Sequence, residues 1–229
     1  DPVSHAALLE VRSLRADVYA AQAQLPLRLM LSGADEMRAA GAAEHPRLQA
    51  ALAEVEQIFA SIGVQIGPIS YHDIDSSYRT LSGVDTGSES FRDLFAQSAG
   101  MEPGIPLFVV ERFDDGAGGL GAVGGISAAI PGTPQPGDRF AGVVVATAFS
   151  NPQDEADLLG VTMAHEIGHF LGLFHSTEAN GMSDGLSDTG LSDEGNLMHF
   201  LSRAESNALT PYQGFVVRSH PVMTVEVMQ

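Results

Sequence analysis

The amino-acid sequence predicts an α/β fold over its first two thirds, followed by a smaller irregular part that ends in a helix. Segments with the apolar period of strands alternate with segments that have the period of helices, as in a sheet layer covered by helices. Two short apolar runs, within 105–110 and 142–149, are typical of central strands buried on both faces. From about residue 178 the chain changes character and becomes rich in Gly, Ser and Asp.

The first well-marked elements are a strand, a helix and a second strand. Residues 26–31 alternate between apolar and polar side chains, which predicts a strand. Apolar residues recur every three or four positions over 46–62, which predicts an amphipathic helix, and Gly63 is a suitable stop. Residues 64–74 alternate again and predict the second strand.

A short helix and an edge strand are expected next. Residues 88–98 place Phe91, Leu94 and Phe95 on one helical face. Residues 120–130 are rich in Gly and only weakly amphipathic. Glycine in a strand often marks a place where another backbone or a ligand comes close. This segment therefore predicts an edge strand beside a ligand.

The last third contains two expected helices with a loop between them. Residues 154–173 are predicted to be helical, and 178–196 form a loop. Thr210 and Pro211 are suited to the N-cap and first position of a final helix that runs to about residue 219. At the other end, residues 4–22 favour a helix, although part of this segment also fits a strand.

The composition bounds the classes of protein that fit. The chain has 229 residues, enough for one domain with a substantial core, and its net charge of −18 disfavours nucleic-acid partners. It contains no cysteine, so thiolate ligands and disulfides are excluded. No apolar run is long enough for a membrane helix. The chain opens at Asp1 without a methionine, which suggests a processed product.

Residues 165–175 carry the chemistry: they read His-Glu-Ile-Gly-His-Phe-Leu-Gly-Leu-Phe-His. His165 and His169 are four residues apart on the predicted helix, so both imidazoles share one face and can bind one ion. Gly172 can break the helix without steric hindrance, and the turn then brings His175 to the same ion. Three protein ligands that leave one position for water are typical of catalytic zinc.

Glu166 completes the predicted mechanism. It is adjacent to the first ligand and is expected to point to the place where a zinc-bound water would lie. Zinc lowers the pKa of such a water and polarises a carbonyl group. We therefore predict that Glu166 is the general base and that it passes the proton to the leaving amine.

The chain resembles the metzincin metallopeptidases. The long motif matches at all five characteristic positions, and Met198 in Asn-Leu-Met-His fits the methionine turn that lies beneath the zinc in that family. The resemblance implies one catalytic domain over 1–229. Its upper lobe, about 1–175, would hold a twisted mixed sheet and two long helices, one of them the active-site helix. Its lower lobe, about 176–229, would be small, irregular and end in a helix.

The resemblance also implies a site for protein or peptide substrates along the edge strand. An extended substrate would add a strand there, against Gly124, Gly125, Ile126, Ser127 and Ala128. Phe200 stands where astacins carry a zinc-binding tyrosine, so that ligand is absent. The acid-rich segment is similar to pappalysins. By analogy with the family we expect a monomeric protein that is secreted or periplasmic.

A calcium site is a further expectation. Four acidic residues crowd the segment between His175 and Met198, and carboxylate oxygens are the ligands that calcium prefers. These residues are Asp184, Asp188, Asp193 and Glu194. A solvated acidic loop is the competing interpretation.

Two other functions remain open. A non-catalytic zinc or calcium adhesion or interaction module could keep the same fold, although it would have no use for a base at Glu166. A zinc hydrolase acting on a small ester or amide is the second alternative. The expected edge strand with a long open cleft argues against it.

Overall fold

A six-stranded sheet forms the centre of the computed structural model, which describes residues 22–114, 116–117, 123–148, 155–178, 180–190, 193–201 and 203–226. The sheet order is β2-β1-β4-β7-β6, and β8 pairs with the first residues of β1. Four of these strands are parallel to one another: β1 (Gln22–Leu31), β2 (Val64–Asp73), β4 (Ile105–Val110) and β7 (Val143–Ala146). Two are antiparallel to their neighbours: β6 (Gly125–Ser127) and β8 (Thr224–Glu226).

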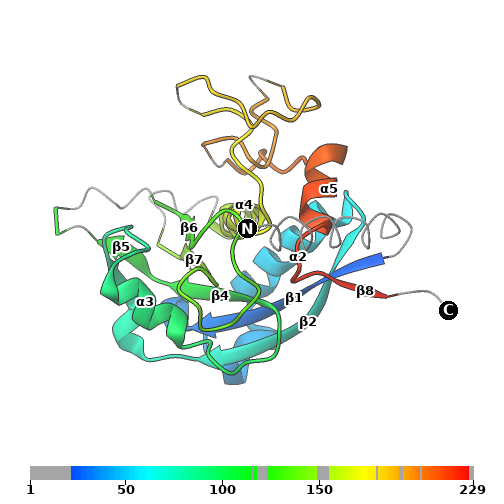
Figure 1. The fold of residues 1–229 in the computed structure, drawn as a ribbon. Coiled ribbons are helices and arrows are strands. Elements are labelled where there is room, and N and C mark those ends of the chain that lie inside the picture. The colour runs from blue at the N-terminus through cyan, green and yellow to red at the C-terminus, as the bar shows by residue number, and fades with distance from the viewer. Residues whose placement is uncertain are drawn as a thin grey trace, which may run out of the picture.

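Two long helices cover one face of the sheet. These are α2 (Pro46–Ala60) and α4 (Glu155–Phe170), which lie side by side over the strands in Figure 1. The core beneath them contains Leu107 and Val109 of β4. The intervening Phe108 belongs to a second core, together with Phe95 of α3 (Glu89–Ala96). Alternate side chains of β4 thus enter two cores, which explains its continuous apolar run.

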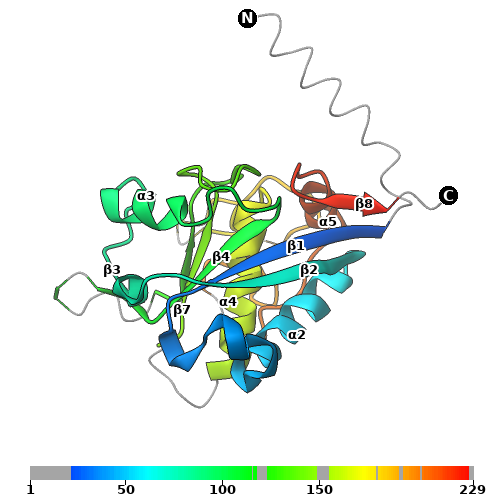
Figure 2. The same cartoon turned by 90° about the horizontal axis from the view of Figure 1, so that it is seen from below.

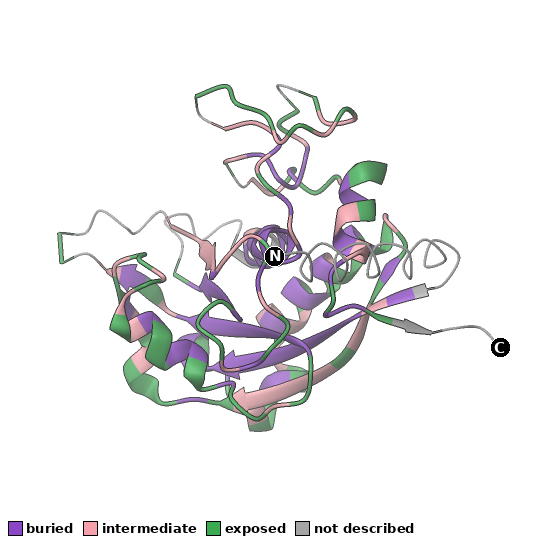
Figure 3. Ribbon diagram, in the orientation of Figure 1, coloured by how far each residue is buried: buried purple, intermediate pink, exposed green. Residues whose placement is uncertain are grey.

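Burial follows this arrangement, as Figure 3 shows. Every residue of β4 and of β7 is buried, and so are the described side chains of α4 from residue 159 to 170. The predicted central strands and the predicted motif helix are confirmed. Residues 178–190 are mostly exposed or half-buried.

The final helix follows the irregular segment, as expected. It is α5 (Pro211–Arg218), and it begins with a capping box in which Thr210 and Gln213 each satisfy the backbone N–H of the other. The mixed sheet, two long helices, irregular segment and last helix agree with the predicted fold class. The division of the chain into two lobes near residue 175 stays a prediction.

Several elements were not predicted. The strand β8 lies beside the start of β1, as Figure 2 shows. A separate two-stranded parallel sheet joins β3 (Thr80–Ser82) to β5 (Arg112–Asp114). The described residues also contain three short 3-10 helices: η2 (Ala34–Glu36), η3 (Ala39–Glu44) and η4 (Ser76–Arg79). Such short elements carry too few residues for a clear period.

Two expectations fall wholly or partly outside the described residues. The helix expected over 4–22 is one, except that Gln22 already belongs to β1. The edge strand expected over 120–130 is the other, and its described part contains β6 at 125–127. Within the described part of the chain, no helix is long and apolar enough to cross a membrane.

Candidate active site

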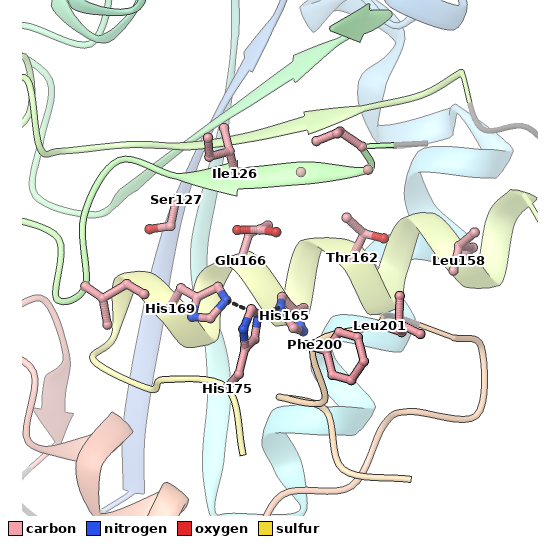
Figure 4. A pocket seen from close by; sticks show the side chains of 14 residues that line it. Ile126, Ser127, Leu158, Thr162, His165, Glu166, His169, His175, Phe200 and Leu201 are labelled. Atoms are coloured by element: carbon pink, nitrogen blue, oxygen red, sulfur yellow. Dashed lines mark hydrogen bonds between the residues drawn. The ribbon is translucent and has the colours of Figure 1, made fainter. Parts of the chain in front are cut away.

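The helix α4 and the turn after it position three histidines. His165 and His169 lie one turn apart in the last part of α4. Gly172 then adopts a φ of 106°, a conformation that residues with a side chain rarely take. The chain reverses there and brings His175 back beside the two helical histidines. Figure 4 shows the three rings pointing toward one another.

The three rings approach through the same atom. The Nε2 atom of His175 lies 3.3 Å from Nε2 of His165 and 3.1 Å from Nε2 of His169. Two nitrogens bound tetrahedrally to zinc, each at about 2.0–2.1 Å, would be about 3.3 Å apart. Among the described residues, these histidines are the only group of three or more His, Cys, Asp or Glu side chains with ligand atoms within 4.8 Å of one another.

The opposite nitrogen of each ring fixes its tautomer. Nδ1 of His165 donates to the carbonyl of Leu197 at 2.7 Å, and Nδ1 of His169 donates to the carbonyl of Leu173 at 2.7 Å. A carbonyl only accepts, so each Nδ1 carries the proton and each neutral ring presents a bare Nε2 lone pair. Converging lone pairs repel one another unless a cation lies between them. The site therefore fits a bound zinc ion.

The third histidine is held differently. Nδ1 of His175 lies 3.0 Å from Oε2 of Glu178, and both side chains are partly exposed. A carboxylate at this position orients the ring and strengthens Nε2 as a ligand. Glu178 was not predicted from the sequence, although an acidic residue three positions after the last histidine of the motif was a signal for it.

The environment keeps the buried histidines neutral. Burial, reinforced by repulsion from the neighbouring imidazole of His169, lowers the pKa of His165 to about 3. Burial also lowers the pKa of His169 to about 4, and the neighbouring His175 adds to this effect. A neutral imidazole is the form that binds a metal, so these rings are ready to bind at neutral pH.

Glu166 lies on the side of α4 that faces β6. Its carboxylate points up toward the strand, away from the ring of His175, in Figure 4. Burial raises the pKa of Glu166 to about 8, and a hydrogen bond from the backbone N–H of Ser127 opposes this shift. The carboxyl group thus lies between α4 and the strand, and its role as a general base stays a prediction.

A cavity of about 490 Å³ opens beside these residues. One wall is the β6 segment and the opposite wall contains Phe200 and Leu201, with Leu158 and Thr162 of α4 between them (Figure 4). Leu158 and Thr162 were missed, although they precede His165 by seven and three residues and thus share its helical face. Apart from the three histidines and Glu166, the described residues that line the cavity are uncharged.

The predicted substrate residues separate into two groups. Gly124, Gly125, Ile126 and Ser127 line the cavity. Ala128 does not, because it is 5% exposed and packs into the core beside α3, while its N–H donates to the carbonyl of Gly142.

Met198 lies directly beneath α4. It is fully buried, and a Cβ added to Gly168 would be 2.7 Å from its sulfur atom. The preceding residue, Leu197, provides the carbonyl that holds His165. This position agrees with a methionine turn below the histidines, and the role of Met198 stays a prediction.

The four acidic residues predicted to bind calcium do not converge. Asp184 accepts from the backbone of Leu186 and from Thr189, and Asp188 accepts from the backbone N–H of Tyr212. The other two, Asp193 and Glu194, contact the backbone of Gly195 and the side chain of Arg203. These carboxylates hold the segment together by separate local contacts, so the geometry does not support a calcium site.

A family model described as metallo-peptidase family M12B, reprolysin-like, matches residues 81–221, which is more than half of the chain. The chain belongs to this family. The match includes all three histidines, Glu166 and Met198. The predicted resemblance to zinc metallopeptidases is thereby confirmed. The similarity of the acid-rich segment to pappalysins remains untested.

Two solved structures resemble this reprolysin-like chain. Metalloproteinase-II from Bacteroides fragilis aligns with a TM-score of 0.53 and 16% identity, over 88% of this chain and 53% of that one. Archaemetzincin from Methanopyrus kandleri aligns with a TM-score of 0.49 and 19% identity, over 86% of this chain and 95% of that one. The first likeness shows a shared fold, and this chain spans about half of that structure's length. No curated protein sequence matches the chain.

Proposed function

We propose that this metallopeptidase is a zinc-dependent endopeptidase in which His165, His169 and His175 hold the ion and Glu166 is the general base. One observation carries the proposal: three Nε2 atoms converge to the spacing of zinc ligands beside a buried carboxyl group. The cavity bordered by a strand edge supports an extended peptide as substrate.

The backbone of β6 is suited to hold that peptide. Ala128 donates to Gly142 and Gly124 accepts from Ala146, so Gly124 and Ala128 turn these backbone groups toward β7. Because backbone groups alternate along a strand, Gly125 and Ser127 turn theirs toward the cavity. A substrate in extended form would pair with the backbone of Gly125 and with the carbonyl of Ser127, since the N–H of Ser127 faces the Glu166 carboxylate. The apolar side chains of Leu158, Phe200 and Leu201 suit an apolar residue next to the cleaved bond.

The chemistry then divides between the ion and the chain. When bound, zinc would lower the pKa of a water molecule and polarise the substrate carbonyl. The Glu166 carboxylate accepts the proton of the attacking water and delivers it to the nitrogen of the leaving amine.

The substitution Glu166→Ala tests this assignment. It should abolish cleavage of a quenched peptide while zinc content, measured by mass spectrometry, stays at one ion per chain, because Glu166 is not a ligand. Near-normal turnover by the variant would refute the proposed mechanism. The matched control is Glu56→Ala, at an exposed position on α2, which should leave turnover unchanged.

A map of cleavage sites separates the alternatives. The endopeptidase should cut a complex peptide mixture internally, and a zinc chelator should stop it. A non-catalytic adhesion module would bind zinc and cut nothing, whereas a small-ester hydrolase would cleave esters and leave peptides intact. Enrichment of apolar residues after the cleaved bond would support the role given to Phe200 and Leu201.

A further inference from the structure

The backbone of β6 lies directly on the side chain of Glu166. A Cβ atom built on Gly125 would be 2.5 Å from Cγ of Glu166 and 3.1 Å from its Oε1 atom. The same Cβ would be 3.1 Å from Cγ2 of Thr162. Real Cβ atoms essentially never come within 3.0 Å of a heavy atom to which they are not linked through the neighbouring chain. The strand therefore approaches the base this closely only because residue 125 has no side chain.

A second contact from the same strand reaches the other end of Glu166. The backbone of Ser127 faces the carboxylate and lowers the pKa of Glu166, while Gly125, two residues earlier, covers the aliphatic stem. Thr162 is one helical turn before Glu166, and its Cγ2 atom also lies against the backbone of Gly125. Figure 4 shows Glu166 between α4 and β6 beneath Ile126 and Ser127. The strand thus contacts the base at two points.

We propose that Gly125 is a positioning residue of the peptidase, whose missing side chain lets β6 hold the Glu166 carboxylate in place. This inference rests on the proposed function, in which Glu166 is the base. It gives β6 a second task besides pairing with the substrate. The same strand would then fix the position of the substrate peptide and the position of the Glu166 carboxylate relative to each other. A shift of about 1 Å in the position of a catalytic group relative to the substrate reduces turnover by about 100-fold.

The substitution Gly125→Ala is a sharp test, because the backbone itself accepts alanine. The φ angle of Gly125 is not positive, so alanine introduces no backbone strain, and alanine is favoured over glycine within a strand. The variant should lower kcat by about 100-fold and leave KM within about twofold. Zinc content should stay at one ion per chain. The control Gly41→Ala, at an exposed position with no heavy atom within 4 Å of the added methyl group, should change none of these quantities.

A double-mutant cycle measures the contact without using activity. Four zinc-loaded proteins are compared by melting temperature: the wild type, Gly125→Ala, Glu166→Ala, and the variant with both changes. Gly125→Ala should lower the melting temperature by several degrees in the wild-type background. In the Glu166→Ala background it should have no effect or raise the melting temperature, because the Cγ atom that it meets is gone. The combined variant remains measurable even if Gly125→Ala alone fails to fold.

The outcomes separate the two proposals. Equal losses of melting temperature in both backgrounds would overturn the role of Gly125, as would a folded Gly125→Ala variant with wild-type kcat. If instead the wild type cleaves no peptide but the cycle shows the expected coupling, the contact between Gly125 and Glu166 stands and the endopeptidase function fails. A loss of kcat together with the expected coupling supports both.

Discussion

Each of the three histidines depends on one atom outside its own ring. Backbone carbonyls hold His165 and His169, and these cannot be altered by substitution. His175 is the most exposed of the three, and the Glu178 side chain holds it. Glu178 is therefore the residue at which a contact to a ring Nδ1 atom can be tested by mutation.

Glu178→Gln should weaken zinc binding by about 10- to 100-fold, because the ring of His175 loses a charged partner that orients it and strengthens Nε2. Competition with a coloured chelator measures this affinity directly. Glu56→Gln, on the exposed face of α2, is the matched control and should bind zinc as the wild type does. Unchanged affinity in the Glu178 variant would show that the contact does not matter to the ion.

In the metal-free protein, the two buried histidines and Glu166 should make the unfolding free energy depend on pH in opposite directions. The folded-state pKa values of His165, about 3, and His169, about 4, lie below the unfolded value of about 6.5. Their contribution to the unfolding free energy is present above pH 6.5 and falls by about 2 kcal/mol each at pH 5. Glu166, with its pKa raised to about 8, contributes stability that is lost as pH rises from about 4.5 to 8.

Between pH 8 and 5 these effects are similar in size and opposite in sign. Urea unfolding of the chelated wild type should therefore show little net contribution from the site. In Glu166→Gln only the effect of the histidines remains. The unfolding free energy of this variant should therefore fall by about 4 kcal/mol relative to the wild type as pH falls from 8 to 5. Parallel pH curves for the two proteins would contradict the burial effects described here.

At the scale of elements, a pair of amides joins α5 to the turn that carries Met198. The side chains of Asn196 and Gln213 exchange two hydrogen bonds of 3.0 Å, and both are buried. Asn196 also accepts from the N–H of Met198, and Gln213 also accepts from the N–H of Thr210 at the start of α5. The helix start, the turn and the carbonyl of Leu197 thus form one connected unit.

Gln213→Ala should lower the unfolding free energy by about 1–3 kcal/mol, because it leaves a buried amide of Asn196 without its partner. The change should also weaken zinc binding, since the turn that holds His165 through Leu197 loses its anchor. Urea unfolding and chelator competition measure the two effects. Gln57→Ala, at an exposed position on α2, should leave both unchanged. Stability lost without any loss of zinc affinity would argue that α5 and the site are independent.

The elements also show what the sequence alone could predict. The helices α2 and α4 and the strands β4 and β7 were predicted because their apolar periods, or continuous apolar runs, extend over enough residues. The ligands were predicted because their spacing is local. The strand β8 depends on pairing with a partner some 200 residues away, and the carbonyl of Leu197 lies 32 residues from His165. Contacts at such separations leave no local pattern.

The position of Gly125 was predictable only in part. Glycine in the segment indicated that something comes close to the strand, and the sequence analysis interpreted this as a ligand. In the structure, the group that touches Gly125 is the side chain of Glu166. The distance between a strand and a helix is set by the packing of the whole core, so the sequence could not distinguish the two.

For the molecule as a whole, the metal site connects parts of the chain that share one core. Leu197 and Met198 pack in the same apolar cluster as α2, α4 and the strands β1, β4 and β7. The three histidines lie beside that cluster, and the carbonyl of Leu197, which belongs to it, accepts from His165. A bound ion would therefore stabilise the connection between the two parts, in addition to any catalytic role.

Removal of zinc should lower the melting temperature of the whole protein. A ligand present at 1,000 times its dissociation constant adds about 4 kcal/mol to the unfolding free energy, which for a chain of this size corresponds to a melting temperature higher by about 10 °C. Zinc added back to the chelated protein should restore this difference, whereas calcium should not, because the acidic residues of the irregular segment do not converge. The control is His169→Ala, which removes one of the proposed zinc ligands. Treatment with the chelator should not lower the melting temperature of this variant. Restoration by calcium alone would instead assign the stabilising ion to the acid-rich segment, and a melting temperature indifferent to both metals would mean that the converging histidines hold no ion.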